Sequence, residues 1–129
     1  KLGEFISAKL IDYVAMDIKS EKEKYSYFAG VELDIKKIEE SIKIISKLEN
    51  YEFRTTIIEK EHDLEGIKRM IEWIYNLSGK IKNYSLQGFK KEEELIDKRY
   101  LNFKDTSENY LESLKKEINK YIKNIEIKV

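Results

Sequence analysis

Three segments of the chain alternate apolar and polar side chains with a period of two, which is typical of β-strands. They cover residues 13–19, 51–58 and 84–89. One face of each segment is mainly apolar: Val14, Met16 and Ile18 in the first, Phe53, Thr55 and Ile57 in the second, Tyr84 and Leu86 in the third. The alternation therefore predicts three half-buried strands, at about 13–18, 51–58 and 83–88, each with one face toward a core.

The segments between these strands follow the 3.6-residue period of amphipathic helices. Asp34 and Asp63 stand where a side chain can cap a following helix, and Gly79 stands where a helix can end. The last long helix would be capped by Thr106 or Ser107. The three apolar stripes are Ile35, Ile38, Ile42, Ile45 and Leu48; Leu64, Ile67, Met70, Ile71, Ile74 and Leu77; and Leu111, Leu114, Ile118, Tyr121 and Ile122. A terminal strand at 125–129 is predicted by a final alternation.

Three stretches carry weaker signals. Residues 4–10 have some helical character, residues 20–30 read as a short helical turn and a loop ending at Gly30, and residues 89–106 are mixed and charged. Leu95 and Ile96 favour one short helix within the last of these.

The order of these elements predicts the fold class. Strands that alternate with helices are joined by right-handed crossovers and form a largely parallel sheet, so we expect an α/β fold. At 129 residues the chain has the length of one domain, spanning 1–129. Parallel sheets usually have both faces covered, but the second face here is polar, which favours a solvated or ligand-filled hollow.

That polar face is the candidate site. It collects Asp17, Lys19, Arg54, Thr56, Ser85 and Gln87. So many polar groups on a sheet face are costly unless they pair or bind a ligand. Lys19 and Gln87 fall at the carboxyl ends of their strands, where ligands of α/β folds bind, and Asp17 and Arg54 lie somewhat deeper.

Composition narrows the classes of function. The 25 basic and 25 acidic residues cancel, which argues against nucleic-acid binding. Hydrophobic residues make up 41% of the chain without a run near the ~18 residues of a membrane helix, so we expect no membrane insertion. The chain has no cysteine, which excludes disulfides, thiolate metal sites and cysteine nucleophiles, and fits a cytoplasmic protein.

Three short motifs resemble a known family. They are the Asp-x-Lys within residues 15–19, the Tyr-Glu-Phe-Arg-Thr-Thr of 51–56 and the Leu-Gln-Gly-Phe of 86–89. In their order and spacing they resemble the C-terminal half of the radical S-adenosylmethionine activating enzymes of glycyl-radical enzymes. The closest subgroup is the activating proteins of anaerobic ribonucleoside-triphosphate reductases, with the pyruvate formate-lyase activating enzymes as relatives. The resemblance implies half of a partial (β/α) barrel with a short C-terminal strand.

The resemblance also implies roles for individual residues. Asp17 and Lys19 match an Asp-x-Lys beside the ribose and methionyl group of S-adenosylmethionine, and Arg54 matches an arginine that lines the same pocket. Gln87 stands where pyruvate formate-lyase activators usually have a histidine. Thr56 and Ser85 are weaker candidates for cofactor binding, and read more readily as structural hydrogen-bonding groups.

Two departures from the family limit what is implied. Glu59-Lys60-Glu61 replaces the Pro-Gly that often follows the second strand. The Cys-x-x-x-Cys-x-x-Cys motif that holds the [4Fe–4S] cluster belongs to an N-terminal half absent from this chain. We therefore assign no catalytic and no metal-binding residue here, and expect the isolated chain to be unable to cleave S-adenosylmethionine.

The intact parent is implied to be an anaerobic oxidoreductase. It would use S-adenosylmethionine, the cluster and an electron donor to install a glycyl radical on a partner enzyme. An alternative is a non-catalytic binding module that self-associates through an exposed sheet edge. A weaker alternative is an unrelated enzyme for a phosphorylated ligand.

Single residues also have simpler interpretations. Asp17, Lys19 and Arg54 could form structural ion pairs. His62, the only histidine, is interpreted as a solvated loop residue rather than a catalyst.

Overall fold

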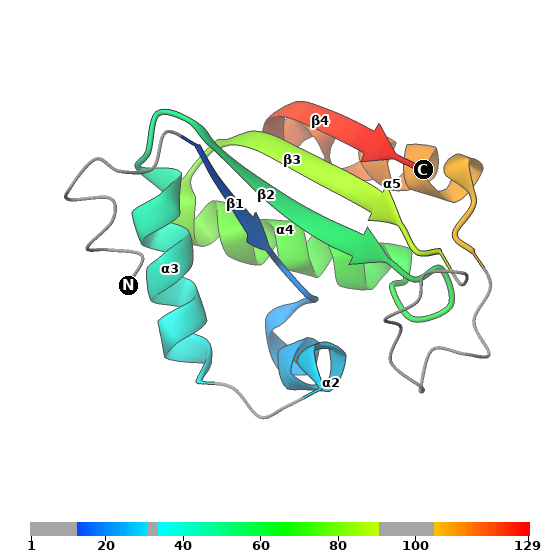
Figure 1. Ribbon diagram of the computed structural model, residues 1–129, viewed down its shortest axis with the longest axis horizontal. Coiled ribbons are helices and arrows are strands. Elements are labelled where there is room, and N and C mark those ends of the chain that lie inside the picture. Colours follow the sequence, from blue (N-terminus) through cyan, green and yellow to red (C-terminus); the bar gives the residue numbers. More distant parts are fainter. Residues whose placement is uncertain (1–12, 31–33, 91–104) are drawn as a thin grey trace.

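The computed structural model describes residues 13–30, 34–90 and 105–129. The helices predicted at 4–10 and around Leu95 and Ile96 lie outside these residues. The elements, labelled in Figure 1, follow in the order β1 (Val14–Asp17), η1 (Lys22–Lys24), α2 (Tyr25–Ala29), α3 (Ile35–Ser46), β2 (Tyr51–Ile57), α4 (Leu64–Ser78), β3 (Ile81–Gly88), α5 (Glu108–Ile118), η3 (Asn119–Tyr121) and β4 (Ile122–Lys128).

The four strands of the described part form one sheet in the order β1-β2-β3-β4, and each neighbouring pair runs parallel. This confirms the predicted α/β class and parallel sheet. Strands that follow one another in this order through crossovers of one hand place their helices on the same face. Figure 1 shows α4 and α5 behind the sheet, whose other face is turned to the viewer. The described strands form an open sheet and no closed barrel.

The predicted helix starts are confirmed by their capping bonds. The side chain of Asp34 accepts from the Lys36 amide at 3.0 Å, and that of Asp63 accepts from the Gly66 amide at 2.7 Å. Of the two candidates for the last helix, Ser107 is the cap. Thr106 is instead buried, where its hydroxyl bonds the end of β2.

The start of the last strand differs from the prediction. The apolar stripe predicted a helix through Ile122, but α5 ends at Ile118, one 3-10 turn follows, and β4 begins at Ile122. Ile122 pairs with Ile81, which itself precedes the predicted start of β3. The apolar residues at this junction fit both periods, and the pairing of the two strands decides between them.

The core lies between the sheet and the helices, as the alternation predicts. Phe53 and Ile57 are buried on the helical face of the central strand β2. The Phe53 ring lies 5.2 Å from that of Tyr51 and 6.3 Å from that of Tyr84, measured between ring centroids. Rings at these separations add edge contacts to their area burial, so this cluster anchors the sheet to its helices.

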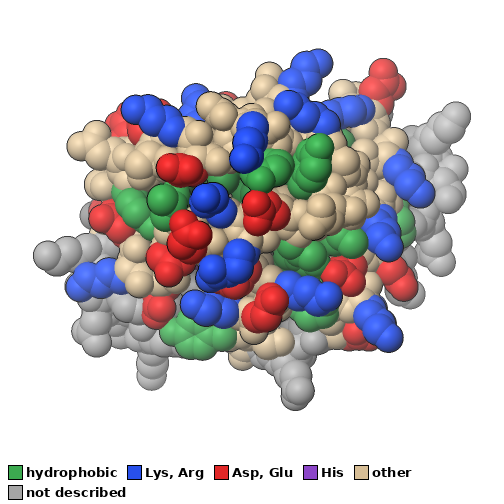
Figure 2. Space-filling view, turned by 180° about the vertical axis from the view of Figure 1, so that it is seen from behind, with side chains coloured by type: hydrophobic (Ala, Val, Ile, Leu, Met, Phe, Trp, Pro, Cys, Tyr) green, Lys and Arg blue, Asp and Glu red, His purple; other side chains and the backbone are tan. Residues whose placement is uncertain are grey.

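The outer surface of the helices carries a mixture of charges. Figure 2 shows this side, with Lys and Arg side chains interspersed among Asp and Glu. Such mixing creates no broad field of one sign. Among the described residues no helix combines the length and the apolar character needed to cross a bilayer.

Candidate functional site

The register of the strands places the predicted site residues on one face. Asp17, Arg54, Ser85 and Glu126 are partners across the four strands. Two residues further along, Thr56, Gln87 and Lys128 are partners in the same way. Because residues two apart share a face, both rows point away from the helices. We call this surface, including Glu52, Asn83 and Asn124 one row earlier, the open face.

Asp17 and Arg54 are in direct contact on the open face. The Arg54 Nε donates to Asp17 Oδ1 at 2.7 Å, and their side chains are 43% and 53% exposed. The hydrogen bond to Asp17 and the charge of that carboxylate raise the pKa of Arg54 above its ordinary value. A half-exposed pair adds little to stability because water and salt screen it. The pair is therefore accessible to a ligand.

A test of this pair separates stability from binding. Asp17→Asn and Arg54→Gln, alone and together, are expected to change the free energy of unfolding by no more than about 1 kcal/mol each, with a coupling energy below about 1 kcal/mol. Urea unfolding of the four proteins measures both quantities. A coupling of several kcal/mol would mean that the pair is a structural element of the fold.

Glu52 forms a second polar centre that sequence analysis did not select. Its carboxylate accepts hydrogen bonds from the hydroxyls of Tyr13, at 2.7 Å, and Ser85, and lies 3.7 Å from Lys128 Nζ. Burial acts to raise the pKa of Glu52, but these hydrogen bonds and the nearby Lys128 and Arg54 outweigh it, so the pKa lies below its ordinary value. Burial and the bond to Glu52 raise the pKa of Tyr13 to about 12. Glu52 is thus held as a carboxylate at neutral pH.

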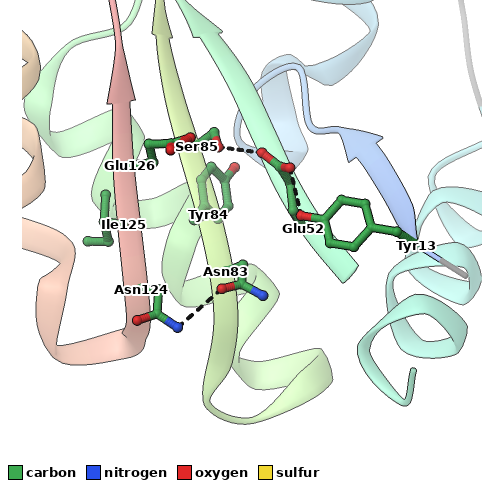
Figure 3. A pocket seen from close by; sticks show the side chains of 8 residues that line it. All are labelled: Tyr13, Glu52, Asn83, Tyr84, Ser85, Asn124, Ile125 and Glu126. Atoms are coloured by element: carbon green, nitrogen blue, oxygen red, sulfur yellow. Dashed lines mark hydrogen bonds between the residues drawn. The ribbon is translucent and has the colours of Figure 1, made fainter. Parts of the chain in front are cut away.

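A shallow pocket of about 380 Å³ surrounds this carboxylate. Figure 3 shows Glu52 on β2 and Ser85 on β3 pointing toward each other, with Asn83 and Asn124 linked nearby. The Asn124 Nδ2 donates to Asn83 Oδ1 at 3.2 Å, and Asn83 Nδ2 donates to the Tyr51 carbonyl at 2.9 Å. The open face is therefore hollowed over β2, β3 and β4, and its hollow is lined by polar groups.

The remaining predicted residues lie farther along the strands. Thr56 and Gln87 are exposed register partners, and Lys19 is exposed just beyond β1. From strand spacing and rise, Gln87 lies about 12 Å from Asp17, with β2 between them. These two side chains share a face without touching, so a single ligand must be about as long as a nucleoside, or longer, to reach both. Ser85 is buried and bonded to Glu52, which agrees with a structural role for its hydroxyl.

The interpretation of His62 as a solvated loop residue is wrong. His62 is 4% exposed. Its Nδ1 accepts from the Ile58 amide at 2.9 Å, and its Nε2 lies 3.0 Å from the Lys19 carbonyl. Since an amide only donates and a carbonyl only accepts, the ring is neutral with its proton on Nε2. A single polar residue between two charged ones carries no periodic signal, so the burial of His62 could not be predicted from the sequence.

His62 makes stability depend on pH. Burial lowers its pKa below the ordinary 6.5, and the bond to the Lys19 carbonyl, with Glu61 and Asp63 nearby, offsets only part of this. The unfolded chain therefore binds the extra proton more readily as the pH falls below about 6.5. We expect full stability above that pH and a loss of up to about 1.4 kcal/mol per pH unit below it.

Urea unfolding between pH 5 and 8 measures this dependence, and His62→Gln should remove it. The pKa values of Glu39 and Glu52 lie below 4.5, so these carboxylates titrate below the pH range of this experiment. An equal slope in the wild type and the variant would assign the effect to another group.

The donor atoms of this chain do not fit the iron–sulfur cluster that the resemblance implies. The sequence has no cysteine, and within the described ranges no three His, Cys, Asp or Glu side chains are grouped to hold a metal ion. Thiolates are the ligands of such clusters. No step through a cluster can therefore be assigned to these residues.

Comparison with known proteins gives one relevant relative. The chain is 34% identical over 132 residues to a protein of Methanocaldococcus jannaschii that is provisionally named a glycyl-radical enzyme activating enzyme. The alignment covers 98% of this chain and 53% of the relative, so the chain spans about half the length of the curated protein it matches. No family model and no solved structure matches the chain. The similarity supports the activating-enzyme family at a coarse level.

Proposed function

We propose that this chain is the C-terminal part of a radical S-adenosylmethionine activating enzyme that installs a glycyl radical on a partner enzyme. The partner is of the anaerobic ribonucleotide reductase or pyruvate formate-lyase type. In this proposal residues 1–129 form one domain, half of a partial barrel. The parent works in the cytoplasm with an electron donor, and an N-terminal half supplies the thiolates of the [4Fe–4S] cluster. This chain alone is inactive.

The observation that carries the proposal is the placement of Asp17, Arg54 and Gln87 on one open face. These residues come from the three segments that resemble the family, and the 34% identity to an activating enzyme of provisional name points the same way. A purely structural role would favour contact among all three. The distance between Asp17 and Gln87 instead suits a ligand that spans the sheet.

The charges on this face complement S-adenosylmethionine. The cosubstrate carries a carboxylate, an ammonium group, a sulfonium and ribose hydroxyls. In the proposed site Lys19 and Arg54 bind the carboxylate, for which a positive donor gives a charge-assisted hydrogen bond. Asp17 accepts from the ribose or the amine, and Gln87, whose amide both donates and accepts, binds the far end of the ligand. Thr56 contributes at the margin, and Ser85 contributes through its bond to Glu52.

Binding of a non-reacting analogue tests this assignment without a cluster. S-Adenosylhomocysteine is titrated into the ¹⁵N-labelled chain, and backbone signals are followed by NMR. We expect saturable shifts at Asp17, Arg54 and Gln87, and weaker shifts with adenosine alone. Shifts confined to the helical face, or none at millimolar analogue, would contradict the proposal.

The exposed sheet edges support a second candidate, a non-catalytic module that pairs with another copy. Among the described residues β1 pairs only with β2, and β4 only with β3. Unpaired strand edges can take up a strand of another chain. Sedimentation of the chain at several concentrations decides: a concentration-dependent dimer supports this candidate, and a monomer at all concentrations rejects it.

A further inference from the structure

Three consecutive backbone carbonyls at the end of β1 are each held by a different side chain. The Asp17 carbonyl accepts from the Tyr25 hydroxyl at 3.3 Å, and the Ile18 carbonyl accepts from Thr55 Oγ1 at 2.7 Å. The Lys19 carbonyl accepts from His62 Nε2 at 3.0 Å. The three donors come from α2, from β2 and from the loop before α4, so distant segments converge on this short stretch.

The three donors are buried beneath the sheet. Tyr25 is 3% exposed, Thr55 1% and His62 4%. The regular ladder to β2 ends here with the bond from the Ile18 amide to the Arg54 carbonyl, at 2.7 Å. Beyond that bond the path of the chain is set by these side chains. Buried donors and carbonyls that lose their partners are costly, so the arrangement holds the stretch in one conformation.

His62 is itself fixed from several directions. Its Nδ1 accepts from the Ile58 amide, and its own amide donates to the Ile58 carbonyl at 2.8 Å. The Tyr110 hydroxyl on α5 donates to the His62 carbonyl. The imidazole is therefore held in place by contacts with the end of β2 and with α5, and it in turn holds the Lys19 carbonyl.

Thr55 is held in a similar way. Its single hydroxyl proton goes to the Ile18 carbonyl, so the Tyr84 hydroxyl, 2.6 Å away, is the donor to Thr55 Oγ1. Both residues lie on the helical face of the sheet, opposite the open face.

We propose that His62, together with Thr55 and Tyr25, positions the Asp17–Lys19 stretch for ligand binding on the open face. None of the three touches the ligand; they act through the backbone that carries Asp17 and Lys19. This inference rests on the proposed function, because Asp17 and Lys19 are the residues assigned to S-adenosylmethionine. It assigns a role to a buried histidine that is not among the residues proposed to bind the ligand.

Two substitutions at position 62 separate the two bonds of the imidazole. In His62→Asn the side-chain oxygen can accept from the Ile58 amide, as Nδ1 does, but the side chain is too short to reach the Lys19 carbonyl. In His62→Gln the amide nitrogen reaches the position of Nε2 and restores that donor. Ile118→Val is the matched control, since it destabilises the buried end of α5 without approaching β1.

The experiment measures amide hydrogen exchange at residues 17–20 and the Kd of S-adenosylhomocysteine by NMR. For His62→Asn we expect exchange at 17–20 to quicken about tenfold or more and the Kd to rise about tenfold. His62→Gln should recover most of both effects. Ile118→Val should leave both at wild-type values despite its lower stability.

Wild-type exchange and affinity in His62→Asn would overturn the positioning role, and so would equal changes in Ile118→Val. If the wild type fails to bind the analogue, the proposed function fails, while exchange at 17–20 still decides whether His62 holds the stretch.

The ring nitrogens of His62 in the wild type give a second measurement that needs no variant. A ¹⁵N spectrum of a neutral ring with the proton on Nε2 is expected above pH 6.5, and a neutral ring with its proton on Nδ1 would overturn the proposal.

Discussion

Replacing Phe53 with alanine is expected to lower the free energy of unfolding by about 3–5 kcal/mol. Phe53 is fully buried on the central strand β2, between the rings of Tyr51 and Tyr84. Alanine removes the buried ring and leaves a cavity that a sheet paired on both sides of β2 cannot close. Domains of this size are stable by about 5–15 kcal/mol, so the variant keeps only part of its stability.

Urea unfolding followed by tyrosine and tryptophan fluorescence measures the loss. Phe53→Leu is the control, because it keeps most of the apolar volume and should cost about 1.5 kcal/mol or less. A loss below 1 kcal/mol for the alanine variant would show that the ring does not anchor the sheet. Because Phe53 faces the helices and the proposed site lies on the other face, the two variants also separate stability from ligand binding.

The fold was predictable because each element carries a strong local pattern. Alternation over 51–57 assigned Phe53 to the core and Arg54 to the other face, and the structure confirms both. The acidic caps at Asp34 and Asp63 marked the helix starts correctly. The error at Ile122 has the opposite cause, since an apolar residue between a helix and a strand fits either period. Its pairing with Ile81, 41 residues earlier in the chain, settles the matter.

For the candidate site, the sequence predicts which face of a strand each residue occupies, but not the contacts between residues of different strands. Alternation placed Asp17, Arg54 and Gln87 on the polar face, where the structure has them. The same pattern placed Glu52 there too, but nothing local distinguishes a carboxylate in a hollow from one in solvent. Its bonds to Tyr13 and Ser85 join segments 39 and 33 residues apart.

The roles of the residues that hold the end of β1 could not be predicted from the sequence for the same reason. Thr55 reads as an ordinary member of an apolar strand face, and His62 as part of a charged loop. Their roles depend on contacts with Ile18 and Lys19, 37 and 43 residues earlier. Such contacts are set by the packing of the sheet on its helices. Sequence patterns therefore located the polar face that carries the proposed site, and the fold shows which residues support it.

If the proposed function holds, replacing Lys19 with alanine is expected to reduce the cleavage of S-adenosylmethionine by the proposed parent enzyme about 10- to 100-fold. A hydrogen bond to a charged group contributes about 1.5–3 kcal/mol, and each 1.4 kcal/mol corresponds to a factor of ten. Lys19 is exposed, and it is its backbone carbonyl that His62 holds. The substitution therefore removes the ammonium group without releasing the strand, and the free energy of unfolding should change by less than about 0.5 kcal/mol.

The measurement requires the chain joined to an upstream half that carries the three-cysteine motif, reconstituted with iron and sulfide under anaerobic conditions. Formation of 5′-deoxyadenosine reports cleavage. Lys43→Ala is the matched control, since this lysine is exposed on α3 and should leave the rate unchanged. Undiminished cleavage in Lys19→Ala would remove this lysine from the site. A loss of cleavage with unchanged stability would separate ligand binding from the structural ion-pair interpretation, which predicts an effect on folding and none on the cosubstrate.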